Sequence, residues 1–205
     1  MRKLAVFFPG IGYTADMPLL YYSRSLAAER GYEIKLLPYG GFPRGVRGDR
    51  DKMAACWQLA LTQAEEMLAN TDLTAYDDIL FVGKSIGTVV AARLASRSPA
   101  AGRIRLILYT PMEDTFVYPF DDAIVFTGDA DPWVGATDSR IPELCRRRDI
   151  PCVRFPEANH SLEIGDGLRD VRALSHVMEE TAGFMDGSRN AVIPAQQPDN
   201  TNGEL

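Results

Sequence analysis

The chain has 205 residues, of which 46% are hydrophobic and 24% charged, and its formal net charge is −6. This composition is typical of one folded globular domain, and the acidic balance argues against a general nucleic-acid binder, which needs clustered positive charge. No apolar stretch approaches the roughly 18 residues of a membrane helix, and the run at residues 4–8 is shorter than the core of a signal peptide. We therefore expect a cytoplasmic protein that contacts neither membranes nor nucleic acids.

Apolar strand-like runs alternate with helical patterns along the chain. Strands are predicted at residues 4–8, 33–38, 79–82, 104–109, 123–126 and 152–155. Helices are predicted at residues 17–30 and 51–68, from residue 86 onward, and at residues 141–148 and 167–185. This alternation predicts an α/β fold with a mostly parallel sheet of about six strands and helices on both faces.

The last predicted helix ends the folded part of the chain. Its apolar residues are expected to share one buried face: Leu168, Val171, Leu174, Met178 and Met185. Residues 1–187 are predicted to form one domain. Residues 188–205 are rich in Asn, Gln, Pro and Gly without an apolar period, and we expect a disordered or loosely packed tail there.

Cysteine and histidine are scarce in this chain. The three cysteines, Cys56, Cys145 and Cys152, are an odd number without C-x-x-C spacing, and there are only two histidines. Reduced structural thiols explain the cysteines, and we expect no metal and no cofactor. The oligomeric state is not predicted.

The segment Gly83-Lys84-Ser85-Ile86-Gly87 carries the most information. It follows the strand at residues 79–82 and opens a helix, which is the context of a G-x-S-x-G nucleophile elbow. On such a turn the serine hydroxyl is pushed out of the fold, and the flanking glycines allow close packing. A phosphate-binding P-loop is excluded, because Asp78 stands where that motif needs a glycine. Lys84 is interpreted as a surface or sheet-edge cation.

A serine hydroxyl needs a base to become a good nucleophile, and two later strand ends offer the missing groups. Asp129 and Asp131 follow the strand at residues 123–126, and His160 follows the strand at residues 152–155. Because the carboxyl ends of parallel strands meet at one edge of a sheet, these residues are predicted to lie near Ser85. The other histidine, His176, is expected to be solvated.

The chain order Ser, Asp, His resembles that of the α/β-hydrolase superfamily, over about residues 4–185. The segment 159–163, Asn-His-Ser-Leu-Glu, is similar to the histidine loop of small bacterial members. The resemblance implies a triad of Ser85, Asp131 and His160, since the family acid precedes a proline, which selects Asp131 over Asp129. It also implies an oxyanion hole made by the backbone N–H groups of Ile11 and Ile86.

The same resemblance implies a lidless enzyme, because only residues 110–122 separate the fourth and fifth strands. The site is then expected to be open and shallow, with substrate-pocket candidates Tyr13, Met112, Phe116, Tyr118 and Trp133. The implied function is a serine hydrolase that cleaves small, short-acyl esters or thioesters through an acyl-enzyme on Ser85. Two alternatives stay open, an acyltransferase or perhydrolase with the same triad, and a non-catalytic hydrolase-fold binding protein.

Overall fold

The computed structural model describes residues 1–46, 49–133 and 140–187, so the expected tail at residues 188–205 lies outside the described part. The strands are β1 (Lys3–Phe8), β2 (Glu33–Leu36), β3 (Asp78–Lys84), β4 (Ile104–Tyr109), β5 (Ala123–Gly128) and β6 (Cys152–Phe155). The α-helices are α1 (Pro18–Glu29), α2 (Arg50–Leu68), α3 (Ile86–Arg97), α4 (Ile141–Arg147) and α5 (Gly167–Met185). Short 3₁₀ turns are η1 (Leu73–Ala75), η2 (Ala101–Arg103) and η3 (Glu113–Val117). All predicted strands and helices are present, with bounds that differ by a few residues.

The six strands form one parallel sheet in the order β2-β1-β3-β4-β5-β6. This confirms the predicted α/β architecture. The order reverses between β1 and β3, so β3 lies centrally and is paired on both edges. Open parallel sheets bind their ligands outside the carboxyl ends of the strands near such a reversal.

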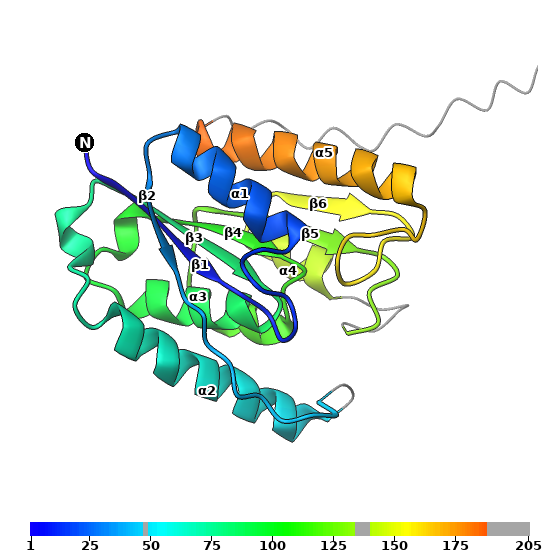
Figure 1. The fold of residues 1–205 in the computed structure, drawn as a ribbon, viewed down its shortest axis with the longest axis horizontal. Coiled ribbons are helices and arrows are strands. Elements are labelled where there is room, and N and C mark those ends of the chain that lie inside the picture. Colours follow the sequence, from blue (N-terminus) through cyan, green and yellow to red (C-terminus); the bar gives the residue numbers. More distant parts are fainter. Residues whose placement is uncertain (47–48, 134–139, 188–205) are drawn as a thin grey trace, which may run out of the picture.

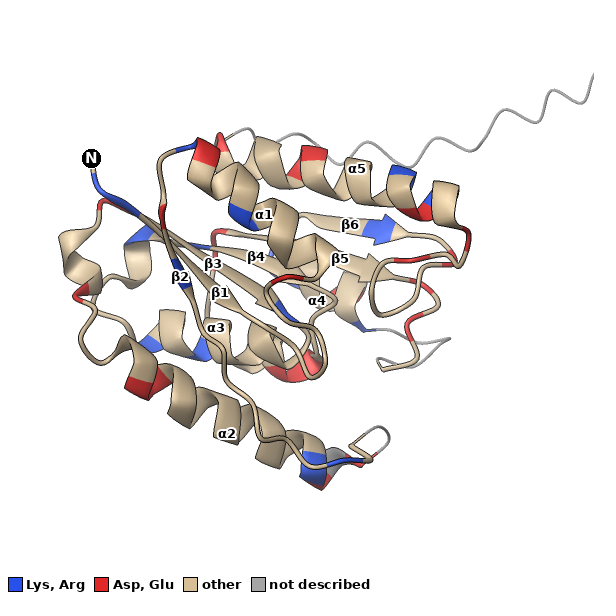
Figure 2. Ribbon diagram, viewed as in Figure 1, with Lys and Arg blue, Asp and Glu red and all other residues tan. Residues whose placement is uncertain are grey.

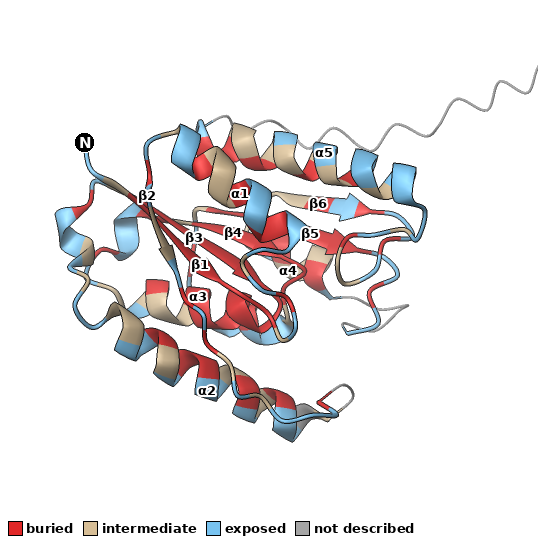
Figure 3. Ribbon diagram, viewed as in Figure 1, coloured by how far each residue is buried: buried red, intermediate tan, exposed pale blue. Residues whose placement is uncertain are grey.

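Helices cover both faces of the sheet (Figure 1). One face packs against α1 and α5, through a cluster that includes Leu20, Ala27, Val177 and Phe184. The other face packs against α2, α3 and α4, through a second cluster that includes residues such as Ala60 and Cys145. The central strands are buried on both faces, while the outer helix surfaces are exposed (Figure 3). This covering explains why the inner strands β1, β3, β4 and β5 are nearly continuous apolar runs, unlike the edge strands β2 and β6.

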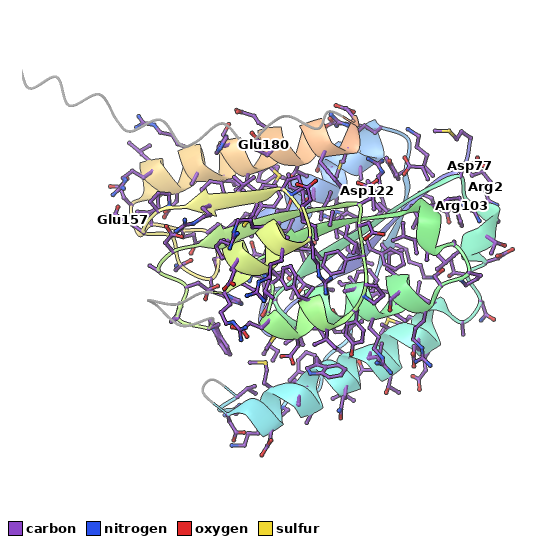
Figure 4. All side chains as sticks on the ribbon, turned by 180° about the vertical axis from the view of Figure 1, so that it is seen from behind. Arg2, Asp77, Arg103, Asp122, Glu157 and Glu180 are labelled. Atoms are coloured by element: carbon purple, nitrogen blue, oxygen red, sulfur yellow. The ribbon has the colours of Figure 1, made fainter. Side chains whose placement is uncertain are left out.

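Charged residues lie mostly at the ends of the strands and on the outer faces of the helices (Figure 2). Arg2, Asp77, Arg103 and Asp122 gather at one end of the molecule, which is the amino end of the strands, and Glu157 lies at the opposite end (Figure 4). Glu157 belongs to the loop that follows β6, so the candidate residues lie at the end marked by Glu157.

The buried face of α5 differs from the prediction. Leu168 and Val171 are 74% and 64% exposed, whereas Met185 is buried as predicted, and the helix also buries Ala173, Val177 and Phe184. The first turn of α5 lies beyond the carboxyl end of β6 (Figure 1), so its apolar side chains have no strand beneath them. Helical spacing alone assigned these residues to the buried face, because it contains no information on where the sheet ends.

Candidate active site

The elbow is built by the central strand and by two glycines. Ser85 joins β3 to α3 with φ of 56° and ψ of −123°. Residues other than glycine rarely adopt this backbone conformation. A Cβ on Gly87 would lie 2.0 Å from the carbonyl oxygen of Phe8, and one on Gly83 would lie 2.9 Å from the carbonyl oxygen of Gly87. The glycines therefore let α3 pack directly against β1 and β3, as predicted for this turn.

The loop after β1 packs against the same elbow. Gly10 and Tyr13 exchange two backbone hydrogen bonds of 3.0 and 3.3 Å, which close a tight loop around Ile11. A Cβ on Gly10 would lie 3.2 Å from Cβ of Ser85, so this loop lies beside the hydroxyl. Among the described residues, the N–H groups of Ile11 and Ile86 have no hydrogen-bond acceptor. Two backbone donors are thus available near Ser85, one of them at the positive N-terminus of α3.

The acid loop after β5 and the histidine loop after β6 contact each other. A Cβ on Gly128 would lie 2.2 Å from the carbonyl oxygen of Ala158. The side-chain oxygen of Asn159 accepts the N–H groups of Ser161 and Glu163 at 2.7 and 3.2 Å. Asn159 therefore shapes the turn that presents the next residue, His160.

Thr110, the residue that follows β4, holds the histidine loop from the other side. Its hydroxyl donates to the carbonyl oxygen of His160 at 3.1 Å. This contact was not foreseen from the sequence. The position of Thr110 directly after a strand, on the carboxyl edge of the sheet, was a usable signal for it.

Ser85, His160 and Asp131 form one continuous hydrogen-bonded chain. His160 Nε2 lies 2.8 Å from Ser85 Oγ, and His160 Nδ1 lies 2.6 Å from Asp131 Oδ2. Asp131 is 1% exposed, and its other oxygen accepts the N–H of Trp133 at 2.9 Å. Because a carboxylate only accepts, Nδ1–H donates to Asp131 and leaves Nε2 as the acceptor for the serine hydroxyl.

The second candidate acid, Asp129, does not join this chain. Its carboxylate pairs with the guanidinium of Arg154 at 3.1 Å on the surface. Of the two acids considered, the structure thus brings only Asp131 to the imidazole.

Burial determines the protonation of the imidazole. It lowers the pKa of His160, the Asp131 hydrogen bond opposes that change, and the charge of Lys84 adds to the lowering. The ring of Trp133 lies with its centroid 5.6 Å from the centroid of the His160 ring and covers part of it. His160 is therefore mostly neutral at pH 7, which is the form that can accept a proton.

Lys84 is not a surface or sheet-edge cation, so that prediction was wrong. It is 1% exposed, because β3 is a central strand that continues to residue 84 and is covered by the loops of the site. Its Nζ lies 5.0 Å from the centroid of the Tyr13 ring. Burial lowers the pKa of Lys84 to about 7, and Asp131 and Glu163 act in the opposite direction.

The expected shallow site is flanked by a cavity of about 790 Å³. The cavity lies between three segments, namely the N-terminal turn of α2, the turn η3 and the residues that follow Asp131. Three of the pocket candidates, Met112, Phe116 and Trp133, line it. The other two pocket candidates lie elsewhere. Tyr13 is buried with its hydroxyl accepting the N–H of Leu19 at 3.0 Å, and the ring of Tyr118 faces a guanidinium of α3 at 5.4 Å.

Other expectations concern metals, thiols and membranes. Cys56, Cys145 and Cys152 are unbridged, and His176 is half-buried with its ring 5.6 Å from that of Phe155 rather than solvated. Within residues 1–46, 49–133 and 140–187, no group of three or more His, Cys, Asp or Glu side chains is arranged to hold a metal ion. None of the helices in those same ranges combines the length and hydrophobicity needed to cross a bilayer.

Comparisons with known proteins support the fold. No protein-family model matches the chain, and no curated protein matches it in sequence. A lidless α/β serine hydrolase from Xanthomonas campestris superposes with a TM-score of 0.58 at 17% identity, covering 93% of this chain and 84% of the other. Est1E from Butyrivibrio proteoclasticus, also solved with ferulic acid bound, superposes with a TM-score of 0.62 at 13% identity, covering 91% and 88%. A serine hydrolase homologue from Coxiella burnetii gives 0.58 at 15% identity, covering 87% and 84%.

These similarities establish the α/β-hydrolase fold without a lid domain, and they confirm the expected resemblance at the level of fold. Residues 110–122, where family members insert a lid, form only the short turn η3 and its connections. At identities below 20%, the likeness does not extend to substrate or reaction.

Proposed function

We propose that this protein is a serine hydrolase that cleaves small ester or thioester substrates through an acyl-enzyme on Ser85. The observation that carries this proposal is the hydrogen-bonded chain from Asp131 through His160 to Ser85, with distances of 2.6 and 2.8 Å. Ser85 lies on a strained turn at the carboxyl edge of the sheet, beside two backbone donors for which the described part of the chain offers no acceptor. A binding module has no need for all of these features together.

The geometry supports a two-step reaction. His160 Nε2 takes the proton of Ser85 as Oγ bonds to the substrate carbonyl carbon, and Asp131 stabilises the imidazolium through Nδ1–H. In this proposal the N–H groups of Ile11 and Ile86 donate to the oxyanion, each contributing on the order of 10²–10³ in rate. The C–O or C–S bond then breaks, and His160 gives its proton to the leaving group. Water repeats the sequence on the acyl-enzyme and releases the acid.

The cavity that Trp133 borders is the candidate substrate pocket, because the centroid of the Trp133 ring also lies 5.6 Å from that of the His160 ring. Its volume of about 790 Å³ is sufficient for a small organic molecule. Its lining includes apolar side chains such as Met53, Met112 and Phe116 and carboxylates such as Asp51 and Asp114. A long alkyl chain would gain little there, compared with about 0.8 kcal/mol per methylene in a fully apolar pocket.

We therefore expect turnover of p-nitrophenyl acetate and butyrate at least equal to that of the octanoate and dodecanoate. Methyl ferulate belongs in the same series, because Est1E binds ferulic acid. A catalytic efficiency that rises several-fold with each pair of added methylenes up to dodecanoate would contradict the short-acyl preference.

The hydrolase proposal is tested by labelling with a fluorophosphonate probe. We expect stoichiometric labelling of the wild type and none of Ser85→Ala, while Ser175→Ala, which changes an exposed serine of α5, labels like the wild type. An unlabelled wild type would favour the non-catalytic binding protein, and a labelled Ser85→Ala would place the nucleophile elsewhere. Product analysis with an added alcohol or peroxide then separates hydrolysis from acyl transfer and perhydrolysis. We also propose that the protein acts in the cytoplasm.

A further inference from the structure

Lys84 is a buried cation that the reaction above does not use. It ends β3 directly before Ser85 and is 1% exposed. Its Nζ lies 5.0 Å from the centroid of the Tyr13 ring, on the loop that also carries Ile11. Among the described residues, the amino group has neither a hydrogen-bond acceptor nor an ion-pair partner within 4.0 Å. The side chain is therefore enclosed without direct pairing.

Such a side chain has a cost for the fold. Removing an ammonium group from water is unfavourable unless it is paired, and an apolar side chain of the same length usually suits a buried position better. The strand would be equally well formed by methionine at this point. Packing thus accounts for the length of the side chain but not for its charge.

The charges around Lys84 all belong to the candidate active site. The carboxylates of Asp131, on the acid loop, and Glu163, on the histidine loop, favour its charged form. The face of the Tyr13 ring, from the loop after β1, attracts a cation as well. In turn, the positive charge of Lys84 disfavours the protonation of His160. The carboxylate of Asp131 thus favours the protonated forms of both Lys84 and His160, while the two positive charges disfavour each other.

We propose that Lys84 is a positioning residue of the triad, whose buried charge works with the burial of His160 to favour the neutral form that accepts the serine proton. The inference depends on the proposed function, since a neutral His160 matters for a nucleophilic Ser85 and not for a binding protein. In this proposal Lys84 acts through the charges of Asp131 and His160 and not by contact with the reacting atoms.

The charge is present in the pH range where it is needed. The pKa of Lys84 is about 7 and that of His160 is lowered from 6.5, so Lys84 is largely protonated while His160 titrates. Without Lys84, only burial would oppose the preference of Asp131 for the imidazolium, and the ring would become protonated at a higher pH. The activity would then be lost earlier as the medium becomes acidic.

The test is an NMR titration of the His160 ring in the wild type and in Lys84→Met, Lys84→Arg and Lys3→Met. A separate variant, His176→Gln, identifies the His160 signals, because the chain has only two histidines. Lys84→Met keeps the length of the side chain and removes its charge, and Lys84→Arg restores the charge. Lys3→Met is the matched control, since Lys3 also faces a tyrosine ring, at 5.1 Å, but lies at the amino end of β1.

We expect the pKa of His160 to rise by about 0.5–1 in Lys84→Met, to stay near the wild-type value in Lys84→Arg, and to be unchanged in Lys3→Met. The acid limb of the pH profile of fluorophosphonate labelling should move by the same amount. A folded Lys84→Met with an unchanged or lower pKa of His160 would overturn the inference. The titration needs no turnover, so this failure is distinct from that of the hydrolase proposal, which appears as absent labelling of the wild type.

Discussion

Replacing Lys84 by methionine should stabilise the protein, and by more at low pH than at high pH. The pKa of Lys84 falls from 10.5 to about 7 on folding, chiefly through burial. The folded state therefore resists protonation, and its stability decreases as the pH falls from 10.5 to 7, below which the cost is constant. The difference of about 3.5 between the two pKa values corresponds to about 5 kcal/mol at pH 6.

At pH 9 the destabilisation by Lys84 is reduced to about 2 kcal/mol, because only about 1.5 pH units separate this pH from the pKa of the unfolded lysine. The difference in unfolding free energy between Lys84→Met and the wild type should therefore shrink by about 3 kcal/mol between pH 6 and pH 9. Urea unfolding of both proteins at the two pH values measures it. A difference independent of pH, or a variant less stable than the wild type at pH 6, would refute the reasoning.

Three further predictions follow from the site. Asp131→Asn should lower ester turnover by about 10⁴-fold through loss of the correct tautomer, whereas Asp129→Asn should leave it near the wild-type rate; equal losses in steady-state assays would count against the assignment. The acid limb of kcat/KM should have its midpoint below 6.5, because the pKa of His160 is lowered and only the neutral ring is active; a midpoint above 6.5 would disagree. Gly87→Ala should destabilise the fold by about 3 kcal/mol or more, because the new Cβ would lie 2.0 Å from a carbonyl oxygen of β1. Gly102→Ala, which meets nothing within 4 Å, should change stability by less than about 0.5 kcal/mol in thermal unfolding, and similar effects would contradict the packing argument.

Sequence patterns were sufficient for the sheet and for the meeting of three distant side chains. Parallel strands bring their carboxyl ends to one edge, so a serine, an aspartate and a histidine that follow strand ends have to converge there. The choice of Asp131 over Asp129 came from the family resemblance, in which the acid precedes a proline, and not from the strand pattern. Both follow β5, and the pairing of Asp129 with Arg154 is a contact between neighbouring strand ends that no local pattern contains.

Burial was the property that the sequence did not determine. Lys84 was interpreted from its residue type, yet its position before Ser85 on the central strand decides its environment. Tyr13 and Tyr118 were expected to wall an open, lidless site. The ring of Tyr13 is instead buried against Lys84, and Tyr118 lies against Arg93. The directions of such side chains depend on loop conformation, which periodicity does not describe.

The most direct test of a covalent mechanism on Ser85 is mass spectrometry of the protein quenched in acid during turnover of p-nitrophenyl acetate. We predict one acetyl group on the tryptic peptide that contains Ser85, formed in step with the release of the first equivalent of p-nitrophenol and absent from Ser85→Ala. Hydrolysis that proceeds with no acetylated peptide, or acetylation at another residue with full activity of Ser85→Ala, would contradict the mechanism.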